Sequence, residues 1–169
     1  MNKILKSILH FRMPIQYSTY RGESELLEII ALVERDLSEP YSIFVYRYFL
    51  YNHPELCFVA RNEEQRIVGV IIGRAFVHKR GRFRGYIGML AVAQEYRRKY
   101  GIGTELVRRV LAVMQEMRVE EVVLEAESTN VAALEFYRKL GFRRDKYLSR
   151  YYMNGSDAYR LKYFFPGEY

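Results

Sequence analysis

The segment MLAVAQEYRRKYGIGT, residues 89–104, decides the fold. An apolar run ends at Val92, a basic turn follows, and Gly101 and Gly103 open a stretch whose apolar residues recur at helical spacing. This order predicts a strand, a turn and a helix. The first N–H groups of a helix have no partner within it, and the helix dipole adds positive potential there. Because glycine has no side chain, a pyrophosphate can approach the backbone of such a turn closely.

Arg97, Arg98 and Lys99 place mobile positive charge directly before the first glycine. A Gly-x-Gly before a helix is a weak motif by itself, because a tight turn with a solvated basic rim has the same sequence. The turn lacks the lysine of a P-loop, and no acidic residue follows where a Rossmann ribose partner is expected. The local pattern therefore leaves two interpretations, a phosphate site and an ordinary turn.

The rest of the chain predicts an α/β protein. We expect strands over residues 15–20, 56–61, 66–78, 86–93, 121–127, 142–153 and 158–165, and helices over 23–37, 41–51, 104–117 and 130–140. In the first helix, the expected inward residues are Leu26, Leu27, Ile30 and Val33. The order of elements predicts a mixed central sheet of about seven strands with helices on both faces.

Length and composition indicate one folded globular domain, because the chain has 169 residues and 50% of them are hydrophobic. We place this domain at residues 14–169, preceded by a basic arm at residues 1–13. The arm contains Lys3, Lys6 and Arg12 but no acid, a composition shared by transit peptides and by mobile or partner-docking arms, and we expect the latter. No apolar run approaches the roughly 18 residues that cross a bilayer, so no membrane-spanning segment is expected.

The cysteine and histidine content and the net charge limit the kinds of site and partner that we expect. Cys57 is the single cysteine, which excludes an internal disulfide and fits a reducing, cytoplasmic compartment. His10, His53 and His78 lie far apart, so no metal site is expected. The net charge of +7 favours acidic partners such as nucleotide phosphates, nucleic acid or an acidic protein, although a merely soluble basic surface explains it equally well. A second basic cluster spans residues 79–84.

Two motifs in the same order resemble those of a known enzyme superfamily. Arg98-x-x-Gly101-x-Gly103 resembles the acetyl-CoA motif of the GNAT superfamily of N-acetyltransferases. Residues 130–142 resemble the later motif Asn-x-x-Ala-x-x-x-Tyr-x-x-x-Gly-Phe of the same superfamily. The resemblance implies the GNAT fold, acetyl-CoA as co-substrate, a pyrophosphate at the turn and a pantetheine arm along residues 89–92. The cofactor-binding residues that it implies are Leu90, Val92, Arg97, Arg98, Gly101, Gly103, Thr104, Asn130 and Tyr137.

Further segments narrow the resemblance within that superfamily. Residues 36–43, 46–49, 84–92 and 150–155 look like the catalytic subunits of N-terminal acetyltransferase C (NatC), and the match extends over about residues 15–162. The resemblance implies acetylation of nascent proteins whose initiator methionine is followed by a hydrophobic or amphipathic residue. It also implies action on ribosomes together with auxiliary subunits.

Acetyl transfer to an amine needs a base for the ammonium proton and an acid for the departing thiolate. Glu125 is the expected base, because a carboxylate in the middle of a strand, in a sheet covered by helices, is costly to bury without a reason. A carboxylate paired with a nearby arginine is the alternative interpretation. Tyr137 is the expected acid, since it shares one stripe of its helix with Asn130 and Ala133. The alternative for Tyr137 is a core tyrosine with a satisfied hydroxyl.

The resemblance places the peptide substrate at two tyrosine-containing segments. Leu37, Glu39 and Tyr41 lie in the loop between the first two helices, and Tyr151 and Tyr152 lie in the last hairpin. Glu39 can pair with the substrate ammonium or share the role of base, or it can simply cap the following helix. Direct transfer in a ternary complex is favoured over an acylated Cys57, because no neighbour that lowers a thiol pKa is visible. We expect the oxyanion to meet a backbone N–H near Leu90.

Two alternatives remain at the level of the sequence. The first keeps acetyl transfer but changes the amine, to a lysine side chain, the N-terminus of a ribosomal protein or a small amine. The second is a non-catalytic basic module that binds ribosomes or RNA through phosphates, without sequence-specific recognition of nucleic acid.

Overall fold

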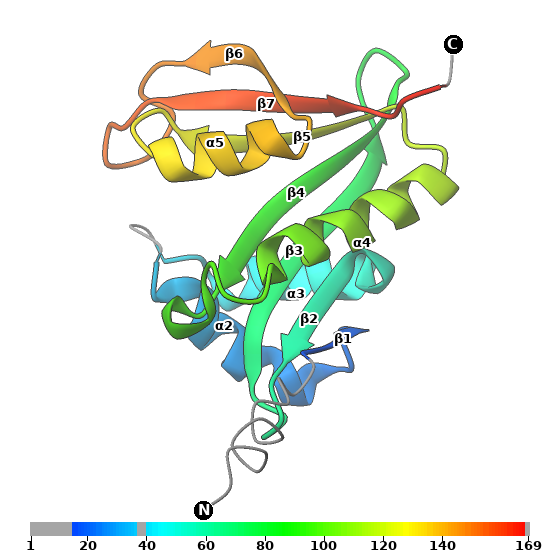
Figure 1. Ribbon diagram of the computed structural model, residues 1–169. Coiled ribbons are helices and arrows are strands. Elements are labelled where there is room, and N and C mark those ends of the chain that lie inside the picture. Colours follow the sequence, from blue (N-terminus) through cyan, green and yellow to red (C-terminus); the bar gives the residue numbers. More distant parts are fainter. Residues whose placement is uncertain (1–14, 37–39, 168–169) are drawn as a thin grey trace, which may run out of the picture.

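The computed structural model describes residues 15–36 and 40–167 (Figure 1). The basic arm expected at residues 1–13 lies outside the described residues, and so do Leu37 and Glu39.

One mixed sheet of seven strands, in the order β1-β2-β3-β4-β5-β7-β6, forms the centre of the molecule (Figure 1). The strands are β1 (Gln16–Thr19), β2 (Cys57–Arg61), β3 (Ile67–Val77), β4 (Phe83–Val92), β5 (Glu121–Glu127), β6 (Arg143–Leu148) and β7 (Ala158–Phe164). Only β4 and β5 pair in parallel, and the other neighbours are antiparallel. The predicted mixed α/β sheet is confirmed.

In the described part of the chain, four α-helices and three 3-10 turns accompany the sheet. They are η1 (Glu23–Glu25), α2 (Leu26–Glu34), α3 (Ile43–Asn52), η2 (Pro54–Leu56), η3 (Gln94–Tyr96), α4 (Ile102–Glu116) and α5 (Val131–Lys139). Local capping explains two helix starts: Ser42 accepts a hydrogen bond from the N–H of Phe44, and Asn130 accepts one from the N–H of Ala133. At the other end of α5, Gly141 has a φ of +102°, a left-handed conformation that suits glycine.

The predicted inward face of α2 is partly wrong. Leu26 and Val33 are buried as expected, whereas Ile29 and Leu32 are buried although they were not predicted, and Leu27 is 74% exposed. Seven of the first eight residues of α2 are apolar, so spacing alone does not distinguish the inner face.

Helices cover both faces of the sheet over β3 and β4. On one face a Cβ at Gly85 would contact Met114 of α4, and on the other a Cβ at Gly88 would contact Phe49 of α3. Figure 1 shows α4 and α5 in front of the sheet and α3 behind it. Among the described residues, no helix has the length and apolar character that crossing a membrane requires.

The sheet forks between β4 and β5. Their parallel pairing covers Arg84, Gly85 and Tyr86 of β4 and ends there. A register shift then makes Gly88 an additional residue of β4 relative to β3, which bends the strand locally. The β5-facing edge of residues 87–92 is consequently left without a paired strand among the described residues.

Candidate active site

The fork between β4 and β5 contains a cavity that unites the predicted site. Its walls come from β4, the turn before α4, β5, the first turns of α5 and the loop after β6. The predicted residues that line it are Leu90, Val92, Arg97, Arg98, Gly101, Gly103, Thr104, Glu125, Asn130, Tyr137, Tyr41, Tyr151 and Tyr152. All predicted site residues that the structure describes therefore meet in one place, although they come from segments far apart in the sequence.

The turn before α4 has the geometry of an anion site. Arg98 and Gly101 have φ values of +60° and +65°, and Gly101 precedes the helix without a side-chain cap among the described residues. A Cβ at Gly101 would meet nothing within 4 Å, so the backbone there is open to an approaching group. The free N–H groups of the first helical turn and the helix dipole suit a pyrophosphate.

Gly103 has a second role that the sequence did not indicate. A Cβ at this position would lie 3.2 Å from Cζ of Phe136, so the absence of a side chain allows α4 to pack closely against α5. The two glycines therefore act differently, one through its backbone conformation and the other through close packing.

Arg97 is already engaged by the protein. Its Nε donates a hydrogen bond to the carbonyl oxygen of Val92 at 2.9 Å, and its Nη2 pairs with Asp36 at the end of α2. These contacts tie the turn to β4 and leave Arg98, which also lines the cavity, as the cation with fewer constraints. The carbonyl of Val92, expected along the pantetheine arm, is likewise occupied by Arg97.

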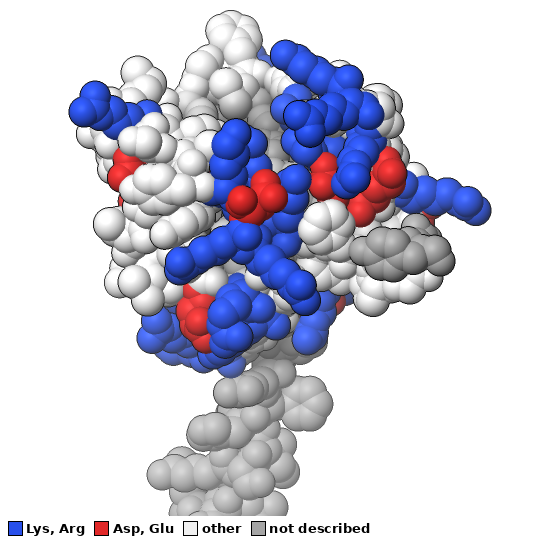
Figure 2. Space-filling model, turned by 90° about the horizontal axis from the view of Figure 1, so that it is seen from above, with Lys and Arg blue, Asp and Glu red and all other residues white. Residues whose placement is uncertain are grey.

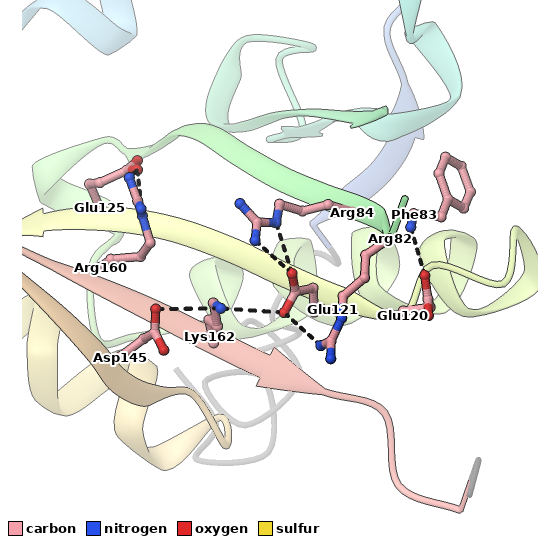
Figure 3. A network of polar contacts seen from close by, with 9 residues as sticks. All are labelled: Arg82, Phe83, Arg84, Glu120, Glu121, Glu125, Asp145, Arg160 and Lys162. Carbon is pink, nitrogen blue, oxygen red and sulfur yellow. Dashed lines mark hydrogen bonds and ion pairs between the residues drawn. The ribbon is translucent and has the colours of Figure 1, made fainter. Parts of the chain in front are cut away.

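Glu125 projects into the cavity from β5 with only 8% of its side chain exposed. Tyr86 donates its hydroxyl proton to Oε2 at 2.7 Å, and Nη2 of Arg160 lies 3.3 Å from Oε1. Figure 3 shows the Arg160 guanidinium pointing at this carboxylate. The arginine pair considered in the sequence analysis is therefore present, and the carboxylate nonetheless faces the cavity. Burial, and then the charge of Glu125, raise the pKa of the Tyr86 phenol.

Tyr137 is buried on α5 at the inner end of the cavity. Its ring makes edge contacts with Phe136 and Phe142, at centroid distances of 5.0 and 5.5 Å. Burial raises the pKa of the Tyr137 phenol, so its hydroxyl keeps its proton near neutral pH. The side chain thus packs in the core and also presents a proton donor to the cavity.

Tyr151 and Tyr152 reach the cavity from the loop after β6. The strand predicted over residues 142–153 is therefore wrong at its end. β6 stops at Leu148, and Arg150 has a φ of +49° while its N–H bonds to Asp157 at 2.7 Å. The two tyrosine rings contact each other edge to face at 5.0 Å. Burial raises the pKa of both phenols, which therefore act as neutral hydrogen-bonding groups.

Cys57 lies outside this cavity and is buried on β2. Its Sγ donates to the carbonyl oxygen of His53 at 3.3 Å, and burial raises the pKa of the thiol to about 12. A protonated, enclosed thiol is a poor nucleophile.

Sequence reasoning missed two residues that contact Glu125. Tyr86 lies within the segment 84–92 that carries the NatC resemblance. The sequence does not show that its side chain points at Glu125. Arg160 is opposite Glu125 only through the register between β5 and β7, which no local pattern specifies.

A family model described as the acetyltransferase (GNAT) family matches residues 26–142. The chain belongs to this acetyltransferase family. The GNAT fold expected from the two motifs is confirmed.

The relatives of this GNAT chain are N-terminal acetyltransferases. N-alpha-acetyltransferase 30 of Xenopus laevis is 53% identical over 148 residues, which cover 88% of this chain and 54% of the relative. N-alpha-acetyltransferase MAK3 of Arabidopsis thaliana is 51% identical over 152 residues, covering 90% of this chain and 78% of that protein. The chain thus spans little more than half of the Xenopus relative.

A solved structure, described as the NatC complex bound to Gag peptide and CoA, contains a chain with the same fold. The superposition has a TM-score of 0.85 and 41% sequence identity, and it covers 90% of this chain and 99% of that one. The similarity to NatC catalytic subunits expected from the sequence is confirmed.

Proposed function

We propose that this GNAT chain transfers the acetyl group of acetyl-CoA to the α-amino group of nascent chains that begin with Met followed by a hydrophobic or amphipathic residue. The observation that carries the proposal is the cavity in the β4–β5 fork, which joins a helix start suited to an anion, a buried carboxylate and a group of tyrosines. Relatives named N-alpha-acetyltransferase 30 and MAK3, and a NatC structure bound to peptide and CoA, support it.

The cavity fits acetyl-CoA, which supplies an acetyl group activated as a thioester. The N–H groups at the start of α4 and the guanidinium of Arg98 suit the pyrophosphate. The unpaired edge of β4, residues 87–92, offers backbone groups to an extended amide-containing arm. Leu90 lies on this edge, where a backbone N–H can stabilise the oxyanion.

Glu125 and Tyr137 handle the protons. An α-ammonium group has a pKa of about 7.7–8.0, so a carboxylate can take its proton directly or through one water. As the amine nitrogen forms its bond to the acetyl carbon, the carbon–sulfur bond breaks and the Tyr137 hydroxyl protonates the leaving sulfur. The enclosed thiol of Cys57 supports direct transfer in a ternary complex rather than an acylated enzyme.

Tyr41, Tyr151 and Tyr152 bind the peptide at the mouth of the cavity. Neutral phenols suit backbone amides, because each can donate and accept a hydrogen bond. Leu37 and Glu39 stand directly before Tyr41 in the sequence, and we assign them to the grip on the first substrate residues.

The enzyme works in the cytoplasm with auxiliary subunits that anchor it to ribosomes. Seen from the side of β6 and β7, Lys and Arg predominate over Asp and Glu (Figure 2). Exposed cations of the β3–β4 turn and of β6 include Lys79, Arg80, Arg82, Arg143 and Lys146. Such a surface suits an acidic partner.

A peptide panel tests the proposal. We expect acetylation of Met-Leu, Met-Ile and Met-Lys peptides, and little of Ser-starting or internal-lysine peptides, when the masses of the products are measured by mass spectrometry.

Glu125→Gln and Tyr137→Phe should each lower kcat by about 100-fold with a smaller effect on KM, because they act on proton transfer. A preference for any other amine would reject the substrate assignment, and RNA binding without acetyl transfer would favour the non-catalytic alternative.

A further inference from the structure

Glu125 is held from two sides by the strands that flank β5. From β4, the Tyr86 hydroxyl donates to Oε2 at 2.7 Å. From β7, Nη2 and Nε of Arg160 donate to Oε1 at 3.3 and 3.4 Å. Each carboxylate oxygen therefore has one protein donor, and neither donor belongs to the proton-transfer pair of the proposed function.

The Tyr86 contact lies at the point of the fork. Tyr86 is the last residue of β4 that pairs with β5, opposite Val123. Glu125 follows two residues later on the same side of β5, where the strands have begun to separate. The hydroxyl–carboxylate bond thus bridges the two strands just where their backbones stop bonding.

The ring of Tyr86 makes a cation–π contact with Arg74 on β3. The guanidinium carbon of Arg74 on β3 lies 5.4 Å from the Tyr86 ring centroid, and 4.4 and 5.8 Å from the Phe76 and Phe49 centroids. Cation–π contacts of this kind favour a fixed ring orientation. Because burial and Glu125 raise the pKa of the Tyr86 phenol, its hydroxyl acts as a donor to Glu125 and not as a competing base.

We propose that Tyr86 and Arg160 are positioning residues that clamp the Glu125 carboxylate and keep it directed at the substrate amine. The inference rests on the proposed role of Glu125 as the base. Hydrogen bonds to an ionised group are stronger than those between neutral groups, so both residues hold the carboxylate firmly. Oε1 already accepts two hydrogen bonds from Arg160, whereas Oε2 accepts one from Tyr86 and retains a site for the ammonium or for one water.

The test compares kcat and peptide KM of Arg160→Met, Arg160→Lys and Tyr86→Phe on a Met-Leu peptide at saturating acetyl-CoA. We expect kcat to fall roughly tenfold for Arg160→Met and Tyr86→Phe, with a smaller change in peptide KM. Arg160→Lys should recover part of the lost kcat. Lys146→Met is the matched control, because Lys146 is the β6 residue paired with Arg160 and its substitution removes the same charge without changing a contact of Glu125. Tyr17→Phe is the control for the loss of a tyrosine hydroxyl, since Tyr17 lies on β1 at the edge of the sheet.

The outcomes separate this inference from the function on which it rests. If Glu125→Gln leaves kcat unchanged, the assignment of the base fails. If Glu125→Gln lowers kcat while Arg160→Met and Tyr86→Phe keep the kcat of the parent enzyme, the clamp is refuted and the base stands. In the Glu125→Gln background the clamp predicts no further loss from Tyr86→Phe, and additive losses contradict it. Thermal unfolding verifies that each variant folds, and should Tyr86→Phe not fold, the two Arg160 variants decide.

Discussion

At the residue scale, the burial of Cys57 separates the single thiol from the chemistry. Its raised pKa, about 12 against an ordinary value of 9.0, means that almost no thiolate exists at neutral pH. We expect Cys57→Ala to keep kcat within about twofold, since no step uses the thiol. Native protein should resist iodoacetamide, whereas urea-unfolded protein should be labelled. Rapid labelling of native protein with loss of activity would contradict this prediction.

The raised pKa of Cys57 also has a consequence for alkaline stability. The unfolded thiol loses its proton near pH 9.0, before the folded one does, so ionisation favours unfolding between pH 9.0 and about 12. The contribution of Cys57 is therefore fully present below pH 9.0 and is lost as the pH rises through this window. Cys57→Ala should lose less stability than the parent over this range in urea unfolding.

Gly101 combines a left-handed backbone with open space at the proposed pyrophosphate site. Gly101→Ala should raise the Kd for CoA about tenfold, because the new methyl group stands where the pyrophosphate approaches and the φ of +65° becomes strained. Gly81→Ala is the matched control, since Gly81 has a φ of +82° and equally open space but lies in the β3–β4 turn. Isothermal titration should show weaker CoA binding only for Gly101→Ala. Equal Kd values for the two variants would remove the turn from the binding site.

At the scale of elements, one buried carboxylate joins β4, β5 and β7. The Glu121 side chain is 1% exposed, and Arg84 donates to its Oε1 from Nη2 at 2.7 Å and from Nε at 2.9 Å. Its Oε2 lies 3.5 Å from Nζ of Lys162 and 3.7 Å from Nη1 of Arg82, as Figure 3 shows. Glu121→Gln should lower the free energy of unfolding by about 3 kcal/mol, because it leaves the partly buried Arg84 and Lys162 without their anion. Glu135→Gln, which breaks an exposed pair with Arg138, should cost far less, because solvent screens that pair.

The same carboxylate makes the stability depend on acid. Burial tends to raise the pKa of Glu121, but Arg84 and then Lys162 outweigh it, and the net pKa lies below the ordinary 4.5. The stabilising contribution is thus present above pH 4.5 and is lost as the pH falls through the lower folded pKa. In urea titrations, the difference between the parent and Glu121→Gln should shrink on acidification below that value. A difference that stays constant would contradict the ionic origin of the effect.

Local sequence signals predicted the helices and strands well. Contacts that depend on the pairing of distant strands could not be predicted in this way. The strand at residues 121–127, the capped start of α5 at Asn130 and its end at Gly141 all follow from neighbouring residues. The family resemblance predicted that the site residues would lie together. It did not predict the partners of Glu125, Tyr86 and Arg160, because they stand 39 and 35 residues away and depend on where β4 separates from β5 and on how β7 pairs.

At the scale of the whole molecule, the fork divides the sheet into two parts that share a short seam. β1 to β4 form one part and β5, β7 and β6 the other, and only three residue pairs join β4 to β5. The cavity has walls from both parts. A ligand in the fork therefore contacts both sides of the seam, and its binding free energy adds to their association.

Amide hydrogen exchange with and without CoA tests this coupling. We expect CoA to slow exchange in the first turn of α4 and also across the fork, in β5 and the first turn of α5, because local opening of either part must release the ligand. β1 and β2 lie on the far side of β3 from the cavity and should change little. In Gly101→Ala the same protection should require about tenfold more CoA, which ties the effect to the turn before α4. Protection confined to the first turn of α4 would mean that the cofactor binds one part of the sheet without joining it to the other.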